Sequence, residues 1–534
     1  MMIRELQMKM DVSEEGTCAC YAIEHAFKGP SRVEWEQHAP ALVQILVPLL
    51  GETLPECVRA AWAALNSIVA GVPKEKTGVL ARPLKTSLSL VGEKLSRESA
   101  GSPVELPGLN LPKGLLPFLT VFLQGILQSG SVELREQSAE GLGQVISMTS
   151  QSAIKPFVVQ IAGPLIRTMS DRSASQVRGA ILKALGILID SSGQGLKPFV
   201  PQLQTTFVKC LQDGSSEIRD RAAKNIGPLM KLSTRVDPLV GDLCVQVKSS
   251  ESIGVKLAVV RALCSIFDCA GEKVSLNVLS AAGESIGATL HETDNDTIQQ
   301  AAAACIGAFA LHCMEQELDQ FLKRGMVSGV ARSSIPREER LGSALGLAAS
   351  LRRAPDRLCG PSTDRERVNC VVKGLSFALG DEMVSIREVA AHGSHRFLCY
   401  LIGHHQSIVS SALASLLPGL AALLAGSEPE GKVAGCVCLR KVAEAECIVG
   451  TDYLSAHFAS FIPPLLLLMD GKGNVKSSSE YAMRAALRLS KGDLSFAVHH
   501  VQHMDRSTRS ILTEGTLRRL ARKHGEVEEE VFEW

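Results

Sequence analysis

The cysteine residues with the closest spacing are poorly placed to bind a metal. Cys18 and Cys20 are separated by one residue, and so are Cys436 and Cys438. On a helix the two members of such a pair point about 200° apart and cannot hold the same ion. We therefore predict no metal site at these cysteines.

Three histidines, His499, His500 and His503, form the other cluster with ligating side chains. His499 and His503 are four residues apart and could bind zinc from one helix face, but no third ligand follows at the spacing of a zinc site. A solvent-facing helix is the better interpretation. No phosphate-binding loop, nucleophile elbow, zinc-protease pattern or dinucleotide-binding pattern follows a predicted strand. We expect no catalytic residues, no cofactor and no enzymatic activity.

The composition favours packed helices in a reducing compartment. Hydrophobic residues make up 46% of the 534 residues and aromatic residues only 4%, which is typical of helices packed on helices. Basic and acidic residues number 56 each, so the whole chain is not steered toward DNA or a membrane surface. The 15 cysteines are scattered, and the N-terminal residues lack the apolar centre of a signal peptide. These features predict a cytoplasmic protein that binds neither DNA nor membranes.

One stretch, residues 397–427, contains no Lys, Arg, Asp or Glu. Its length would permit either a membrane span or a buried helix of a repeat. Because His404, His405 and Pro418 dilute its apolar character, we favour the buried helix.

An internal repeat organises the chain. Pro117, Pro156, Pro198 and Pro238 occur in similar contexts at spacings of 39, 42 and 40 residues. Behind each of the first three comes an amphipathic run, a short polar break and a second amphipathic run. Proline costs little in the first turn of a helix, so each unit is predicted to be a helical hairpin. A two-helix period near 40 is typical of HEAT or armadillo repeats, which stack into an all-α superhelix (a solenoid).

Charged residues recur where one helix of the hairpin turns into the next. Arg135, Arg178 and Arg219 fall near the start of successive second helices, and Asp171 and Asp213 fall in the turns before them. A turn carboxylate can cap the following helix. The basic residues have two interpretations: they pair with turn carboxylates in a ladder along the stack, or some of them form the ridge that a partner contacts.

The repeats and their interruptions predict the domain organisation. HEAT repeats are expected over 1–96. We also expect that the chain either starts inside a longer solenoid or comes from a truncated gene model. A loop at 97–113 leads to core repeats at 114–332. A charged, proline-bearing linker at 333–367 precedes C-terminal repeats at 368–500, and a helix with an acidic tail completes the chain at 501–534.

Longer phrases in the core resemble one family. The segments LLPFLTVFLQGILQSGSVELREQ, IKPFVVQIAGPLIRTMSDR and KPFVPQLQTTFVKCLQD resemble the very large HEAT-repeat translational activator of the general-control (amino-acid starvation) pathway. The resemblance is dense over 115–240 and diffuse over 41–95 and 241–330. It implies a scaffold that binds ribosomes and helps to activate the kinase that phosphorylates the alpha subunit of initiation factor 2.

The resemblance also implies a docking site for the kinase's N-terminal RWD domain, in which an arginine is important. Arg167 is the best match in this sequence, Arg172 is second, and Lys209 is a further candidate contact. From its position alone, Arg167 could equally be a basic residue that stabilises the end of its helix. The leading hypothesis is therefore a regulatory scaffold that recruits the kinase during starvation. The alternative is a general HEAT-repeat adaptor for protein transport or assembly.

Overall fold

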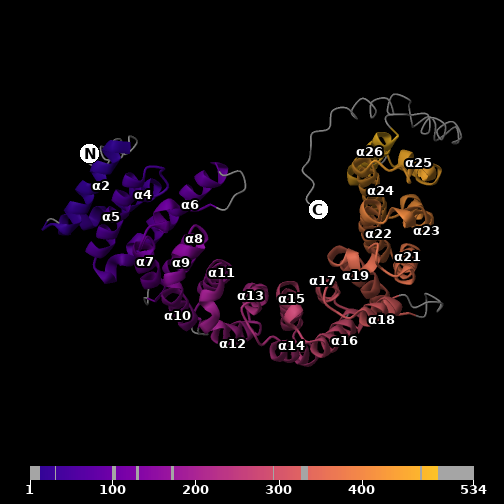
Figure 1. Ribbon diagram of the computed structural model, residues 1–534, viewed down its shortest axis with the longest axis horizontal. Helices are drawn as coiled ribbons and strands as arrows, with labels where there is room; N and C mark the ends of the chain where they lie inside the picture. The colour runs from indigo at the N-terminus through magenta and orange to yellow at the C-terminus, as the bar shows by residue number, and fades with distance from the viewer. Residues whose placement is uncertain are drawn as a thin grey trace. The chain divides into compact units, whose positions relative to one another are not determined.

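The computed structural model describes residues 13–30, 32–98, 104–127, 131–169, 173–292, 294–325, 335–469 and 472–490. These ranges contain α-helices and short 3-10 helices, and no strand occurs within them (Figure 1). The predicted all-α fold is therefore confirmed. The chain divides into two compact units, one within 1–236 and 261–270 and the other within 237–260 and 271–534. The division passes through the helix α15 (Ile253–Ala270).

The first unit consists of helical pairs joined by short turns. The pairs α7–α8, α10–α11 and α12–α13 follow one another, and the second helices α6, α8, α11 and α13 stack in that order (Figure 1). The helices of this unit are α2 (Ser13–Lys28), α3 (Arg32–Trp35), α4 (Ala39–Leu49), α5 (Pro55–Gly71), α6 (Ala81–Glu98), α7 (Leu116–Leu127), α8 (Val132–Ser147), α9 (Gln151–Ile154), α10 (Val158–Thr168), α11 (Ser175–Ser192), α12 (Val200–Cys210) and α13 (Ser216–Met230).

The second unit repeats this arrangement. The first helices α18, α21, α23 and α25 form one layer, and the second helices α17, α19, α22, α24 and α26 stack as the other layer (Figure 1). The helices are α14 (Asp237–Ser249), α16 (Leu276–Glu292), α17 (Asp296–Phe309), α18 (Glu315–Gly325), α19 (Arg337–Arg353), α20 (Pro355–Cys359), α21 (Arg365–Leu379), α22 (Val384–His404), α23 (Val409–Ala425), α24 (Pro429–Val449), α25 (Phe458–Leu468) and α26 (Gly473–Leu489).

The recurring prolines lie at the starts of first helices. Pro117 is the second residue of α7, and Pro238 is the second residue of α14. Pro156 and Pro198 lie in the 3-10 turns Lys155–Phe157 and Gly193–Phe199, which lead directly into α10 and α12. A fixed φ and a missing N–H are tolerated at these positions because the first-turn donors have no partner within the helix.

Apolar side chains between the two layers form the core. Phe118 and Phe122 of α7 are fully buried, and burying each side chain of this size contributes about 1.5–3 kcal/mol. The layers approach so closely that a Cβ added at Gly141 of α8 would lie 2.5 Å from the ring of Phe122. Glycine is required there by packing.

The apolar stretch 397–427 covers the end of α22 and all of α23. By length and composition, the helical segment Gln406–Ala425 is long enough and apolar enough to cross a membrane. In the structure α23 packs against α21, α24 and α25, as a first helix of a repeat does. Its leucines at 413, 416, 417, 420, 423 and 424 are buried.

The predicted linker at 333–367 is wrong, because this segment holds the second helix α19 and the short helix α20. Pro336 is the N-cap of α19 and does not interrupt a helix. Glu338 and Glu339 lie in the first turn, where their negative charges interact favourably with the positive end of the helix dipole and stabilise the helix. The small residues that follow allow close packing: a Cβ at Gly346 would lie 2.8 Å from the ring of Phe321.

Other predicted domain boundaries meet the structure only in part. The described portion of 97–113 contains the end of α6 and a 3-10 turn, Pro107–Asn110, in which Leu109 is buried. The predicted C-terminal helix and acidic tail at 501–534 lie outside the described residues.

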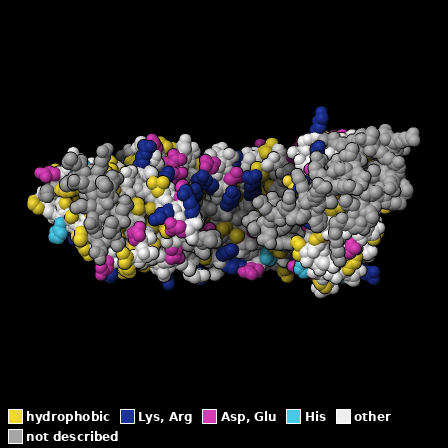
Figure 2. Space-filling view, turned by 90° about the horizontal axis from the view of Figure 1, so that it is seen from above, with side chains coloured by type: hydrophobic (Ala, Val, Ile, Leu, Met, Phe, Trp, Pro, Cys, Tyr) yellow, Lys and Arg dark blue, Asp and Glu magenta, His cyan; other side chains and the backbone are white. Residues whose placement is uncertain are grey.

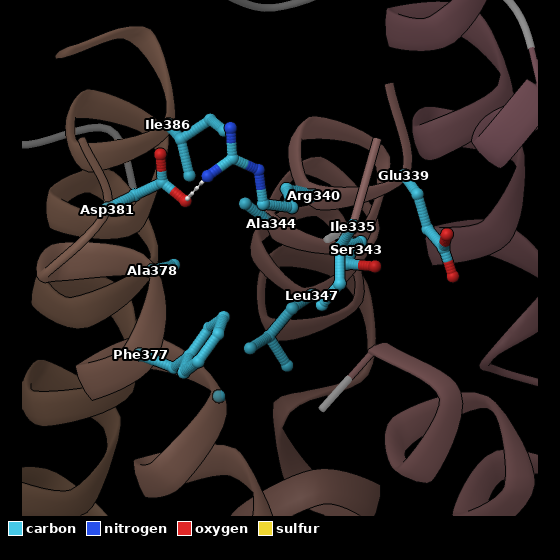
Figure 3. Close-up of a pocket in the computed structure, with 11 residues that line it drawn as sticks. Ile335, Glu339, Arg340, Ser343, Ala344, Leu347, Phe377, Ala378, Asp381 and Ile386 are labelled. Carbon is cyan, nitrogen blue, oxygen red and sulfur yellow. Dashed lines mark hydrogen bonds and ion pairs between the residues drawn. The ribbon is translucent and has the colours of Figure 1, made fainter. Parts of the chain in front are cut away.

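A buried ion pair joins α19 to the next repeat. Arg340 Nη1 lies 3.1 Å from Asp381 Oδ2, and the two side chains are 8% and 1% exposed (Figure 3). Asp381 Oδ1 also accepts a hydrogen bond from the backbone N–H of Met383 at 2.9 Å. Arg387 Nη1 donates to the carbonyl oxygens of Asp381 at 2.8 Å and Glu382 at 2.9 Å. We call this arrangement a rung: a turn aspartate held by the arginine of the preceding repeat and by its own arginine.

Replacing Arg340 with alanine is expected to lower the free energy of unfolding by about 3–5 kcal/mol, because Asp381 would be left buried and charged without its partner. Chemical denaturation of the whole chain measures this. The matched control is Arg337→Ala on the same helix, whose pair with Asp296 is exposed and 3.7 Å long and should contribute less than about 1 kcal/mol. Equal effects of the two substitutions would contradict the structural role of the rung.

A second buried acid, Glu446, predicts a pH dependence. Its carboxylate accepts hydrogen bonds from the backbone N–H groups of Leu454 at 3.0 Å and Tyr453 at 3.2 Å. Burial nevertheless raises the pKa of Glu446 from 4.5 to about 7. Between these values the folded chain binds more protons than the unfolded chain, so this group stabilises the fold below about pH 4.5, and the contribution is lost as the pH rises to about 7.

The variant Glu446→Gln has no titrating group at this position. We expect the difference in unfolding midpoint between wild type and this variant to change with pH between 4.5 and 7, with the wild type becoming relatively less stable toward pH 7. A difference that stays constant over this range would show that the pKa of Glu446 is not raised by folding.

Candidate partner-binding groove

A groove separates two neighbouring first helices of the first unit, α10 and α12. Its volume is about 420 Å³, and we call it the α10/α12 groove. It is lined by Ile166, Met169, Arg178, Pro201, Gln202, Thr205, Thr206, Lys209, Cys210 and Asp213. Six of these residues lie on α12, at positions 201, 202, 205, 206, 209 and 210, which one helix face brings together. The wall therefore combines apolar surface with hydroxyl and amide groups.

An ion pair forms the floor of the groove. Arg178 Nη1 of α11 contacts Asp213 Oδ2 in the turn between α12 and α13, and the two side chains are only 13% and 11% exposed. Asp213 Oδ1 accepts a hydrogen bond from the N–H of Ser215 at 2.9 Å. Arg219 Nη1 donates to the carbonyl oxygens of Asp213 at 2.6 Å and Gly214 at 3.0 Å. This is the same rung that Asp381 forms in the second unit.

We call two exposed cations the rim of the groove: Lys209, which lines it, and Arg167, which follows the lining residue Ile166 in the sequence and does not itself line the groove. Arg167 lies in the last turn of α10, beside the groove residue Ile166, and Lys209 lies in the last turn of α12. Each positive charge offsets the negative end of its helix dipole. Arg167 has no ion-pair partner among the residues that the structure describes. The rim therefore presents two cations beside apolar surface, which suits an acidic face of a protein.

The remaining predicted residues are placed as follows. Arg135 Nε donates to the carbonyl oxygen of Ile126 at 3.1 Å, and its Nη2 donates to Ser173 Oγ at 3.2 Å in the turn of the next repeat. Among the described residues, its partner in the next repeat is this hydroxyl group. Asp171 and Arg172 lie outside the described residues.

The cysteines at close spacing do not come together at a metal-binding cluster. Among the described residues no group of three or more His, Cys, Asp or Glu could hold a metal ion. Cys436 and Cys438 are buried, and burial raises the pKa of Cys436 to about 12. A neutral buried thiol behaves as a small hydrophobic group. The histidines at 499, 500 and 503 lie outside the described residues.

Sequence reasoning missed two features of this architecture. The apolar wall of the groove was not predicted, because its residues come from two helices that are about 40 positions apart in the sequence. The role of Arg340 was not predicted, because its segment was interpreted as a linker. Arg340 nevertheless lies 47 residues before Arg387, which is close to the length of one repeat. Gln299, 41 residues before Arg340, takes the same place: its amide donates to the carbonyl oxygens of Leu290 at 2.9 Å and Glu338 at 2.6 Å.

The stacked helical pairs and the groove define a helical-repeat protein with a surface suited to protein binding. The family described as "Stalled ribosome sensor GCN1-like, HEAT repeats" matches residues 237–532 with one model and residues 1–113 with another. The chain belongs to this family. The α10/α12 groove lies between the two matched segments.

Individual relatives agree with this assignment. The chain is 34% identical to Protein ILITYHIA of Arabidopsis thaliana over 478 residues, which is 89% of the chain and 17% of the relative. It is 32% identical to the eIF-2-alpha kinase activator GCN1 of Dictyostelium discoideum over 416 residues, 75% of the chain and 15% of the relative. The chain therefore spans less than a fifth of these relatives. A crystal structure of Kap121p bound to Ste12p is similar with a TM-score of 0.45 and 14% identity, covering 96% of the chain and 56% of that structure.

The rim and the floor of the groove should respond differently to substitution. Arg167→Ala and Lys209→Ala remove exposed side chains and should change the free energy of unfolding by less than about 0.5 kcal/mol. Asp213→Ala leaves the largely buried Arg178 without its partner and should cost about 3 kcal/mol. Thermal or chemical denaturation measures all three variants. A large loss of stability in the rim variants would show that the rim supports the fold.

Proposed function

We propose that this chain is a non-catalytic regulatory scaffold that binds the RWD domain of the protein kinase acting on initiation factor 2 alpha, and that the α10/α12 groove is the contact. The observation that carries the proposal is the pair of exposed cations, Arg167 and Lys209, at the rim of a groove with an apolar wall and a rigid floor. Relatives named as eIF-2-alpha kinase activators support a kinase as the partner, and the RWD domain is what the family resemblance implies.

The chemistry of the groove suits a protein surface better than a small molecule. The groove is open along two helices, and its polar groups, Gln202, Thr205 and Thr206, project from one helix face. An interface of this kind takes an apolar anchor in the groove and carboxylates at the rim. The rim charges would contribute mainly to the rate of association and to orientation.

The floor contributes rigidity. Because Asp213 is held by Arg178, Ser215 and Arg219 together, the end of α12 is fixed relative to α11. A partner that binds a fixed surface does not have to order it first, which preserves affinity. The scaffold would therefore present its contact in one arrangement.

Regulation without catalysis and a cytoplasmic location agree with the family's name. The family's description refers to sensing of stalled ribosomes, and we propose that this chain acts in association with ribosomes in the cytoplasm. The alternative, a general HEAT-repeat adaptor for transport or assembly, would use the same groove for other cargo. Binding of the kinase's RWD domain to this chain would distinguish the regulatory scaffold from the general adaptor.

The test is binding of the whole chain to the purified RWD domain, measured by calorimetry. We expect Arg167→Glu and Lys209→Glu each to weaken binding by about tenfold or more, since each reversal places like charges across the rim. Arg97→Glu is the matched control, because Arg97 is an exposed arginine in the last turn of α6, outside the groove. Arg172→Ala is included because the family resemblance makes it the second candidate.

Three results discriminate between the possibilities. Binding that is weakened by the two groove variants and not by Arg97→Glu supports both the function and the site. Binding that is indifferent to the groove variants rejects the α10/α12 groove. A folded chain that does not bind the RWD domain rejects the kinase-docking function and favours the general adaptor.

A further inference from the structure

Four arginines recur at a constant interval on the second helices of the second unit. Arg352 lies on α19, Arg396 on α22, Arg440 on α24 and Arg484 on α26, so that each is 44 residues from the next. These helices stack in that order, each packed against the next. We call the four residues the arginine row. None of them belongs to the rungs or to the α10/α12 groove.

Members of the row interact in two neighbouring pairs, Arg440 with Arg484 and Arg352 with Arg396. The guanidinium carbons of Arg440 and Arg484 lie 5.6 and 5.4 Å from the centre of the Tyr481 ring, so this ring joins α24 to α26. Burial, and then the nearby charge of Arg352, lower the pKa of Arg396. These contacts link both ends of the row to its neighbouring members.

Two histidines lie near Arg396 on α22. His392 and His395 lie one turn or less from Arg396, with their rings 6.0 Å apart. Burial, and then the charges of Arg396, His392 and Lys441, lower the pKa of His395 to about 4. Neutral histidines therefore accompany the row at neutral pH, and the arginines carry its charge.

Acidic residues compensate this charge only in part. Glu444 Oε1 lies 3.7 Å from Arg440 Nε, and Glu480 Oε2 lies 3.8 Å from Arg484 Nη2. Both distances exceed those of good charge-assisted hydrogen bonds, and the Nε atoms of both arginines are buried without a hydrogen-bond partner. Arg352 and Arg396 have no carboxylate partner among the residues that the structure describes. Arg396 is therefore a half-buried cation without a carboxylate partner and Arg352 an exposed one, and both can accept an external anion.

The spacing of the row limits the shape of that anion. Packed helices lie about 8–10 Å apart, so consecutive arginines are separated by about that distance along the stack. A polyproline II helix has three residues per turn and rises about 3.1 Å per residue, so every third side chain points to the same side at intervals of about 9 Å. The interval between every third side chain of a polyproline II helix therefore matches the interval between consecutive arginines of the row.

We propose that the arginine row binds an extended acidic peptide segment of a partner protein, in the polyproline II conformation, with a carboxylate at every third residue. Each carboxylate faces the guanidinium of one second helix, where an arginine can donate two parallel hydrogen bonds. Repeat proteins commonly use such extended faces for binding.

Single-stranded RNA fits the row less well. Its recognition depends on aromatic rings that are free to stack with bases. Tyr481 is the exposed aromatic side chain in contact with the row, and its ring already lies beneath two guanidinium groups. RNA is therefore an outcome that the experiment must distinguish.

The experiment measures fluorescence anisotropy of labelled ten-residue peptides with the whole chain at moderate ionic strength. One peptide has glutamate at positions 1, 4, 7 and 10 and proline elsewhere. The control has the same composition with its four glutamates adjacent. We expect the spaced peptide to bind about tenfold more tightly, because only it places one carboxylate on each arginine. A labelled oligouridylate is measured beside them.

Variants locate the binding. Arg352 is exposed, so Arg352→Gln should fold normally and weaken the spaced peptide severalfold, and Arg396→Gln should do the same. Arg337→Gln is the matched control, since Arg337 lies at the opposite end of α19. Equal binding of the two peptides, indifference to Arg352→Gln, no peptide binding, or tighter binding of the oligouridylate would each overturn the proposal. Because no member of the row lies in the α10/α12 groove, this result is independent of RWD binding.

Discussion

The bond between a turn aspartate and the arginine of the preceding repeat is the constraint on which the rest of the structure depends. Asp213 with Arg178 and Asp381 with Arg340 have the same surroundings, although they belong to different units. In both, the second carboxylate oxygen accepts a backbone N–H two residues later, at 2.9 Å. Hydrophobic burial drives the helices together, but it does not fix their register. The rung fixes it, because its hydrogen bonds require one relative position of neighbouring repeats.

The rung also determines what the two helical layers can present. On the layer of first helices, the pair Arg178–Asp213 lines the α10/α12 groove together with the exposed Lys209. On the layer of second helices, the pair Arg340–Asp381 joins α19, which carries Arg352, to the repeat of α22, which carries Arg396. Figure 2 shows one face of the molecule, on which Lys and Arg side chains gather near the middle of the view with Asp and Glu among them. A chain of zero net charge thus carries local basic surfaces.

The fold was predictable because its signals are local and periodic. Proline at the start of a first helix and an arginine at the start of the second are set by backbone chemistry, and both are visible in one sequence. The linker prediction failed because Pro336 and the charges around it look alike whether they cap a helix or interrupt one, and only the packing of Gly346 against Phe321 decides. The site was predictable only as single residues. Arg167 and Lys209 could be named from the family resemblance, but the groove needs Ile166 and Thr205 from different helices, and their proximity follows from the stacking of repeats.

The most direct test of the central claim is hydrogen–deuterium exchange of the whole chain with and without the RWD domain. The account predicts that the amides in the last turns of α10 and α12, around Arg167 and Lys209, become protected on binding, while those of the rung at Asp213 are already slow in the free chain. Protection confined to other helices, with α10 and α12 unchanged in a chain that binds, would contradict the account.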